Sequence, residues 1–176
     1  ELSQTKLSNK LGISSAKVNT IIDTLQKTHL IFTVKAFSVN QTKGSLIKGF
    51  KYYFISPTLS SAIKYMNGAT VLSQEEISQL WENAVASTLN KLCYTTGTIY
   101  SLFYDPSKKG NVDFILQNPI SGEVIPFEVG MNKDNKQVND AIAMYGARYG
   151  IVISDVPQIT FTDKIIKIPF WFFLYL

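Results

Sequence analysis

Residues 110–130, GNVDFILQNPISGEVIPFEVG, contain two apolar runs separated by a polar turn segment. The Asn-Pro-Ile-Ser-Gly segment between the runs is typical of a β-hairpin loop. Pairing outward from this loop places Asp113 roughly opposite Phe127 or Glu128. Opposed side chains of an antiparallel pair have Cβ atoms about 4.5–5.5 Å apart. The stretch therefore predicts that Asp113 and Glu128 lie close enough to share a cation.

Composition limits the class of protein. The 176 residues are 45% hydrophobic, which is enough for one large packed domain or two small ones. No apolar run reaches the roughly 20 residues of a membrane-spanning helix, and no secretory signal pattern is present. The chain has no initiator Met, so we expect a fragment of a longer protein. Its only cysteine, Cys93, cannot form an internal disulfide, so a reducing, cytoplasmic location is expected. One cysteine and one histidine are too few ligands for a structural zinc site.

Charge is distributed unevenly along the chain. Residues 1–70 hold nine lysines and two acidic residues, a net charge of +7. Residues 71–176 hold eight basic and eleven acidic residues, a net charge of −3. This asymmetry favours a basic, nucleic-acid-binding module followed by a more neutral one.

The basic half begins with two short helical patterns around a glycine. A helix carrying Leu7 and Leu11 is expected to stop at Gly12, and a second is expected to begin at Ser14. The apolar residues of this second helix fall at i, i+3, i+4 and i+7, which places them in one stripe along the helix. Two short helices separated by a glycine turn predict a helix-turn-helix. This region resembles the winged-helix DNA-binding superfamily, with residues 14–30 as the recognition helix. Helix-turn-helices also serve as dimer or domain contacts, and that alternative stays open.

Strand-like residues 31–37 and 50–55 then enclose a glycine- and lysine-containing loop, which predicts a wing-type hairpin. Its lysines could neutralise phosphates, although an ordinary solvated loop is the alternative. His29 is interpreted as a dipole or packing residue at the end of the recognition helix, not as a ligand. The predicted DNA-binding residues of the helix and the hairpin are Ser15, Lys17, Asn19, Thr20, Lys43, Lys48 and Lys51.

A domain boundary is expected near Gly68, giving a winged helix-turn-helix domain over residues 1–68 and a second domain over residues 69–176. Ser73 and Glu76 form a capping box for a helix running to about Cys93, with Glu82 at the edge of its apolar face. The pattern that follows predicts an α+β fold with a mixed sheet flanked by helices. Its expected elements are strand 98–104, the hairpin, helix 134–148, strand 151–154, and strand-like residues 156–161 and 165–173.

Four motifs follow one another along the chain: Tyr53-Phe-Ile-Ser-Pro57, Leu80-Trp-Glu-Asn-Ala-Val85, Gly110-Asn-Val-Asp-Phe-Ile-Leu116 and Ile125-Pro-Phe-Glu-Val129. Through the order of its elements and acids, the stretch 73–154 resembles the PD-(D/E)XK, or restriction-endonuclease-like, fold. With the preceding region, the four motifs resemble those of the C-terminal region of a family of prokaryotic AAA-type ATPases, in which a winged helix precedes a nuclease-like domain of unknown function. The resemblance implies an acidic site of Glu82, Asp113 and Glu128, with Mg²⁺ as cofactor and DNA as partner.

One residue departs from the family pattern. Gly130 stands where the family has a lysine, two residues after the second acid, and this favours a site that has lost activity. Lys133 or Lys136 could replace the missing lysine, which would keep a Mg²⁺-dependent DNA endonuclease as the alternative. A third hypothesis is a protein-interaction module that regulates the ATPase half, with an aromatic tail from Phe170 to Tyr175 as its contact surface. The chain has no G-x-x-x-x-G-K-[ST] motif, so no ATP site is assigned to it, and its oligomeric state stays open.

Overall fold

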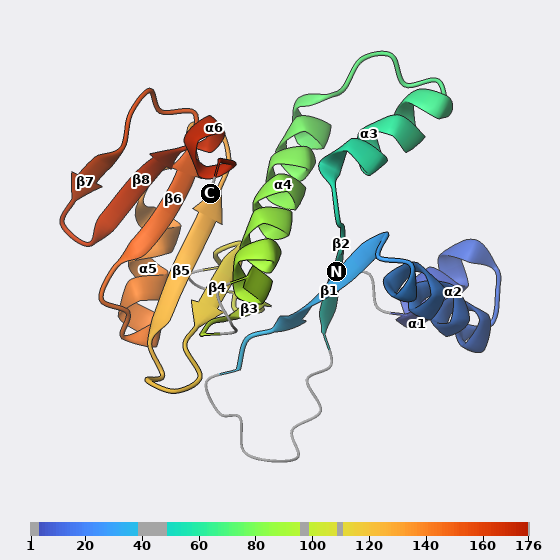
Figure 1. Ribbon diagram of the computed structural model, residues 1–176, viewed down its shortest axis with the longest axis horizontal. Coiled ribbons are helices and arrows are strands. Elements are labelled where there is room, and N and C mark those ends of the chain that lie inside the picture. Colours follow the sequence, from blue (N-terminus) through green and yellow to red (C-terminus); the bar gives the residue numbers. More distant parts are fainter. Residues whose placement is uncertain (1–3, 39–48, 96–98, 109–110, 176) are drawn as a thin grey trace.

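An eight-stranded mixed sheet runs through the molecule in the order β2-β1-β3-β4-β5-β6-β8-β7 (Figure 1). The computed structural model describes residues 4–38, 49–95, 99–108 and 111–175. Helices pack on both faces of the sheet, which confirms the expected α+β class. The strands are β1 (Ile31–Ala36), β2 (Phe50–Phe54), β3 (Ser101–Tyr104), β4 (Phe114–Gln117), β5 (Val124–Val129), β6 (Gly150–Ser154), β7 (Thr160–Thr162) and β8 (Ile165–Pro169).

Two hydrophobic clusters hold the helices against the sheet. One face is covered by α4 (Gln74–Thr95), whose Val85 and Leu89 are buried with residues of β1, β4 and β5. The opposite face is covered by α5 (Lys136–Tyr145), which buries Val138 and Ile142 against Val152. Figure 1 shows α4 in front of the sheet and α5 behind it. None of the helices in the described ranges is both long enough and apolar enough to cross a bilayer.

The N-terminal lobe consists of α1 (Gln4–Leu11) and α2 (Ser15–Lys27), which lie beside the antiparallel β1–β2 hairpin (Figure 1). Gly12 separates the two helices with a φ of 65°, as expected for a glycine in a tight turn. Ser14 caps α2 by accepting a hydrogen bond from the Lys17 N–H at 3.3 Å. The connection between β1 and β2 includes residues 39–48, which are outside the described ranges.

The sheet continues from the N-terminal hairpin into the second half of the chain. β1 pairs in parallel with β3, where Lys35 and Ala36 lie beside Phe103 and Tyr104. Asn83 of α4 joins the same two halves, because its amide accepts from the Phe54 N–H at 3.1 Å and donates to the Phe54 carbonyl at 2.8 Å. The boundary expected near Gly68 falls between α3 (Pro57–Met66) and α4, and the sheet itself extends across that division.

The hairpin predicted from residues 110–130 is present as β4 and β5. Phe114 lies opposite Phe127 and Gln117 lies opposite Val124. The connecting turn closes because the Asn118 side chain accepts hydrogen bonds from two following backbone N–H groups, at 2.9 and 3.2 Å. The register therefore places Asp113 one position beyond the Phe114–Phe127 pair, next to Glu128.

The C-terminal aromatic run differs from expectation. Residues 165–173 are not one strand, because β8 ends at Pro169 and Phe170–Phe173 form the short helix α6. The Phe170 ring stacks on Trp81 of α4 with centroids 4.0 Å apart, and Phe173 is buried against Phe127. These contacts place part of the aromatic run in the protein's own core, while Trp171 and Tyr175 remain exposed.

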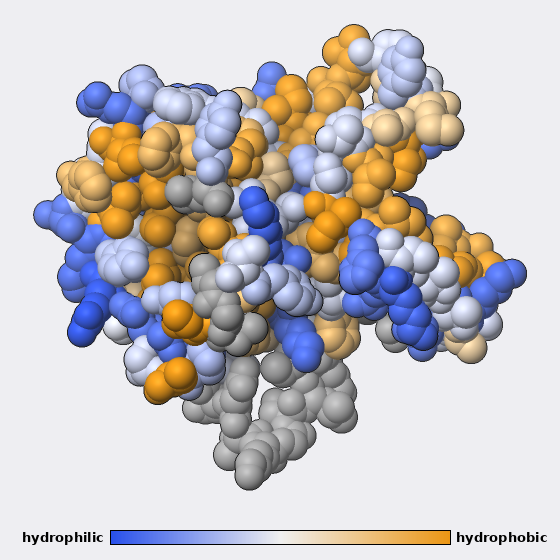
Figure 2. Space-filling view, viewed as in Figure 1, coloured by the Kyte–Doolittle hydropathy of each residue, from blue (hydrophilic) through white to orange (hydrophobic). Residues whose placement is uncertain are grey.

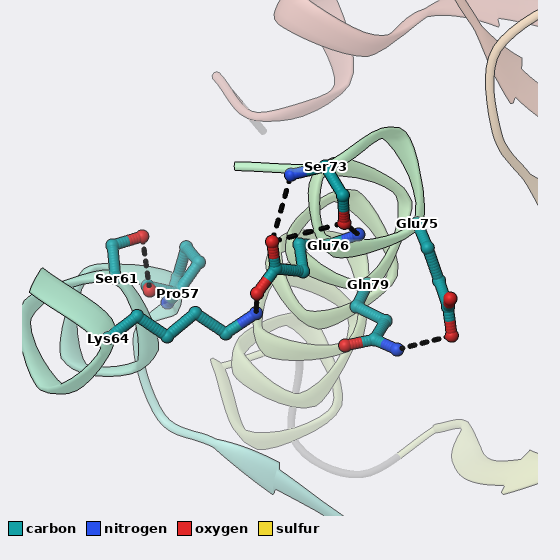
Figure 3. A network of polar contacts seen from close by, with 7 residues as sticks. All are labelled: Pro57, Ser61, Lys64, Ser73, Glu75, Glu76 and Gln79. Atoms are coloured by element: carbon teal, nitrogen blue, oxygen red, sulfur yellow. Dashed lines mark hydrogen bonds and ion pairs between the residues drawn. The ribbon is translucent and has the colours of Figure 1, made fainter. Parts of the chain in front are cut away.

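A polar network joins α3 (Pro57–Met66) to the start of α4 (Figure 3). Ser73 and Glu76 form the expected capping box: the Glu76 carboxylate accepts from the Ser73 N–H at 2.8 Å, and the Ser73 hydroxyl oxygen accepts from the Glu76 N–H at 3.3 Å. Lys64 of α3 donates to the other Glu76 oxygen at 2.9 Å. One glutamate therefore caps α4 and anchors α3 to it.

Candidate active site

Asp113 and Glu128 meet beside the start of β4 and the end of β5. Asp113 lies immediately before β4, and its Oδ2 accepts a hydrogen bond from the Val129 N–H at 2.8 Å. This bond fixes the carboxylate against the backbone of the neighbouring strand, one residue after Glu128. The proximity predicted from the hairpin is therefore present in the structure.

Glu128 is an unusual residue for the interior of a sheet. Its side chain is 1% exposed, and its Oε1 accepts a hydrogen bond from the Lys133 ammonium. Its Oε2 is buried and has no hydrogen-bond partner among the described residues. An unpartnered buried carboxylate oxygen costs several kcal/mol unless something else compensates it.

Gly130 provides the space that Lys133 occupies. A Cβ at position 130 would lie 2.6 Å from the Lys133 Cε, closer than real Cβ contacts permit. The φ of Gly130 is 150°, a conformation that residues with side chains rarely adopt. Gly130 is thus the residue that allows a lysine three positions later to reach Glu128.

The loop carrying Lys133 is held at two further points. The Asn132 N–H donates to Asp155 Oδ1 at 2.9 Å, although Asn132 itself has a positive φ of 53°. Lys167 of β8 donates to the Lys133 carbonyl oxygen at 3.2 Å. The position of the Lys133 side chain is therefore supported by contacts from β8 and from the residue that follows β6.

Burial and mutual repulsion change the protonation of the site. Burial, the charge of Glu128 and the charge of Glu82 raise the pKa of Asp113 to about 7. Burial also raises the pKa of Glu128, although the ion pair with Lys133 opposes that effect. Burial tends to lower the pKa of Lys133, but its hydrogen bond and ion pair with Glu128 outweigh burial and raise it. The lysine is therefore charged, and Asp113 holds a proton more readily than an exposed aspartate does.

Glu82 contributes to the field of this site from α4, but its direct contacts are with β2. Its Oε1 accepts hydrogen bonds from the Tyr53 hydroxyl at 2.6 Å and from the Lys51 ammonium at 3.1 Å. Burial and the neighbouring Glu82 raise the pKa of Tyr53, so this phenol remains a donor. Lys51, which the sequence predicts as a DNA contact, is half-buried and forms an ion pair with Glu82.

The four residues predicted to contact DNA from the recognition helix all lie on α2 and are exposed: Ser15, Lys17, Asn19 and Thr20. The structure places them on the N-terminal lobe and not in the acidic site. The other two hairpin residues, Lys43 and Lys48, lie outside the described ranges.

The donor set of the site is two carboxylates and one lysine. Across the described ranges, no three Asp, Glu, His or Cys side chains are grouped so as to hold a metal ion, and Glu82 does not complete such a group. Asp113 and Glu128 present oxygen ligands of the kind that Mg²⁺ takes, and Mg²⁺ commonly binds to one or two carboxylates and keeps several waters.

Three supporting residues were not identified from the sequence. Tyr53 could have been found from its place in a quoted motif, since an aromatic hydroxyl in a strand facing a helix Glu is a plausible donor. Asp155 and Lys167 lie far along the chain from Lys133, and no local pattern connects them to it.

Comparison with known proteins gives two matches. Residues 1–76 match a family model described as Domain of unknown function (DUF8612). The chain is 32% identical over 171 residues to "Uncharacterized protein MJ1637" of Methanocaldococcus jannaschii, covering 97% of this chain and 34% of that protein. The chain thus spans about a third of the length of this curated relative. No solved structure matches the chain.

Proposed function

We propose that this chain is the nucleic-acid-binding region of a larger ATP-dependent protein and that it carries a Mg²⁺-dependent site for phosphodiester hydrolysis. The observation that carries the hydrolytic part is the position of Lys133 on Glu128 beside Asp113. The resemblance to PD-(D/E)XK proteins leads us to expect a lysine at the second acid. Position 130 holds a glycine in place of that lysine, and Lys133 of the following loop supplies an ammonium group to the second acid, Glu128.

The site also fits a divalent cation. Glu128 has a buried oxygen without a partner in the described part of the chain, and burial, followed by the charges of Glu128 and Glu82, raises the pKa of Asp113 to about 7. Both features indicate negative charge that one lysine does not fully compensate. Asp113 and Glu128 would hold Mg²⁺, which when bound activates water and stabilises charge on phosphate.

The chain's own groups would position the reactants. The Lys133 ammonium has donors beyond the one directed to Glu128, because an ammonium carries three. One of them could orient the attacking water or a phosphate oxygen. Glu82 remains tied to Tyr53 and Lys51, so in this arrangement it contributes its field and not a ligand.

The N-terminal lobe supports the nucleic-acid part of the proposal. The exposed α2 residues Ser15, Lys17, Asn19 and Thr20 belong to a half of the chain with a net charge of +7. Two helices followed by an antiparallel hairpin support the proposal of a winged helix in this half. The nucleotide-hydrolysing module is proposed for the part of the larger protein that this chain does not include, because the chain itself has no phosphate-binding loop motif.

A nicking assay on supercoiled plasmid with Mg²⁺ or Mn²⁺ tests the proposed hydrolysis. Asp113→Asn and Lys133→Met should each lower the rate by about 100-fold or more, the usual scale for removing a positioned electrostatic group. Lys136→Met is the matched control, because Lys136 is exposed at the start of α5 and makes no side-chain contact with Glu128 within the described ranges. It should cleave at the wild-type rate.

Two results would count against this function. Equal cleavage by the wild type and Asp113→Asn would show that the activity belongs to a contaminant. No cleavage by the wild type with either cation would reject the hydrolytic site and leave an inactive nuclease-like domain.

A further inference from the structure

A groove lies between α2, β1 and the C-terminal half of α4, away from the acidic site. Its main cavity has a volume of about 790 Å³. Two smaller hollows adjoin it: one shares Gln26, Thr33 and Lys35 with it, and the other shares Thr33, Asn90 and Tyr94. The three hollows meet at Thr33 and extend across the sheet, from Phe50 and Tyr52 of β2 over β1 to Ser101 and Leu102 of β3, so together they suit an extended ligand.

The electrostatic character of the groove is one-sided. Lys35 and Lys91 line the main cavity and are exposed, and neither forms an ion pair with another described residue. The lining of the main cavity contains no acidic residue. Asp23 lines one of the smaller hollows, but Lys27 pairs with it at 2.7 Å. The groove therefore offers positive charge that an anionic ligand could neutralise.

Aromatic rings accompany these lysines along the groove. Tyr94 lines both the main cavity and one smaller hollow, and it is 76% exposed. Tyr100 lines the same small hollow, while Phe50 and Tyr52 line the hollow at the other end. Positive charge with exposed rings spaced along a channel is the arrangement on which single-stranded nucleic acids stack their bases.

His29 lines the groove from the C-terminal end of α2. The end of α2 has the hydrogen bonds of a Schellman motif, with the His29 N–H donating to the Gln26 carbonyl at 3.0 Å and the Leu30 N–H donating to the Leu25 carbonyl at 2.9 Å. His29 occupies the left-handed position, with a φ of 55°, where glycine is usual. A side chain that lines the groove is thus kept at a position where it costs stability.

From these observations we propose that the groove between α2, β1 and α4 binds single-stranded nucleic acid, with Lys35 and Lys91 contacting phosphates and Tyr94 stacking on a base. This goes beyond the proposed function, which assigns duplex DNA to Ser15, Lys17, Asn19 and Thr20 of α2; of these four residues only Asn19 also lines the groove as described here. The elongated shape favours a strand over a single nucleotide, and the lysine pair and the rings favour a nucleic acid over a peptide.

Fluorescence anisotropy with a labelled oligothymidylate of about 15 nucleotides tests this binding, since known single-strand sites span roughly 4–16 nucleotides. The full chain carrying Asp113→Asn is used in EDTA, so that binding is measured without hydrolysis. Lys35→Glu with Lys91→Glu should weaken binding at least 10-fold and reduce the salt dependence of log K by about 1.4, because two phosphate contacts are lost. Tyr94→Ala should weaken it by about 5-fold or more, the scale of one stacked base.

Matched controls distinguish binding in the groove from a general effect of the protein's positive charge. Lys108→Glu with Lys164→Glu makes the same charge change at exposed residues outside the groove and should leave oligothymidylate binding much less affected. Lys17→Glu should weaken binding of a duplex of the same length, whereas the groove variants should not. His29→Gly should weaken oligothymidylate binding while raising the melting temperature, a combination that simple misfolding cannot produce.

The proposal is overturned if the groove pair and the control pair bind oligothymidylate equally, or if the parent chain does not bind it. Displacement of the strand by an equal concentration of thymidine monophosphate would also overturn it, because the site would then hold a free nucleotide. Failure of the nicking assay leaves this test intact, since the binding measurements already use a chain without the Asp113 carboxylate.

Discussion

Gly130 and Lys133 act as a unit at the residue scale. The missing side chain of Gly130 leaves the volume through which the Lys133 side chain passes to Glu128. Buried acids persist when they are paired, because an uncompensated buried charge costs several kcal/mol. A substitution at Gly130 therefore acts on the backbone, on the lysine and on the buried acid together.

Gly130→Ala should lower the free energy of unfolding by about 2–4 kcal/mol. The estimate combines roughly 1–2 kcal/mol for a positive φ with the cost of displacing Lys133 from Glu128. Gly122→Ala is the matched control, because Gly122 has a positive φ of 73° but nothing lies within 4 Å of an added Cβ. Urea unfolding of both variants measures the difference. Equal destabilisation would mean that the space at Gly130 has no role in placing Lys133.

At the scale of the element, the start of α4 depends on a single carboxylate. Glu76 accepts from the Ser73 N–H and hydroxyl on one oxygen and from Lys64 on the other (Figure 3). The backbone hydrogen bond from Ser73, followed by the bond from Lys64, lowers the pKa of Glu76 to about 2. The charged form is thus the one that caps α4 and holds α3.

The contribution of Glu76 should depend on pH. A carboxyl whose pKa is lower in the folded state than in the unfolded state, about 4.3, stabilises the protein above that value and loses the effect as pH falls towards 2. Glu76→Gln should therefore melt below the wild type at neutral pH, and the gap should close between about pH 4.5 and pH 2. Glu75→Gln is the control, because within the described ranges the Glu75 side chain accepts a hydrogen bond only from Gln79, at 3.4 Å. Thermal unfolding followed by circular dichroism checks this, and a gap that does not change with pH would contradict it.

The elements differ in how well they could be predicted from sequence patterns. The capping box and the β4–β5 hairpin were predictable because each depends on residues close in the chain, such as Ser73 with Glu76. The Phe170–Phe173 helix was not, since a short apolar run fits a strand or a helix and its contact with Trp81 decides between them. The contact between Lys133 and Glu128 could not be predicted either, because the position of Lys133 depends on the φ of Gly130 and on Lys167, which is distant in the sequence.

At the surface of the molecule, α3 exposes several large apolar side chains. Figure 2 shows apolar side chains over α3, where the exposed large residues include Ile63, Tyr65 and Met66. Single exposed apolar residues are common, but a group of them on one helix indicates a contact surface.

At the scale of the whole molecule, the sheet makes the two halves of the chain one folding unit. β1 pairs with β3, and Val34 and Tyr53 of the N-terminal hairpin are buried in the same cluster as Phe114 and Phe127. Small structures with one shared core usually unfold in a single transition. We therefore expect the full chain to unfold cooperatively despite the change in charge near its middle.

A fragment of residues 69–176 tests this continuity. Removing the hairpin would expose the edge of β3, uncover the Phe114 cluster and leave the buried Asn83 amide without its two bonds to Phe54. The fragment should melt at least 10 °C below the full chain or aggregate, since the loss of several kcal/mol shifts the melting temperature of such a domain by roughly 2–4 °C per kcal/mol. A fragment of residues 28–176, which lacks α1 and α2 but keeps the hairpin, is the matched control and should stay close to the full chain. If residues 69–176 instead melted at the temperature of the full chain, the second half would be an independent domain, and the β1–β3 pairing would contribute little to its stability.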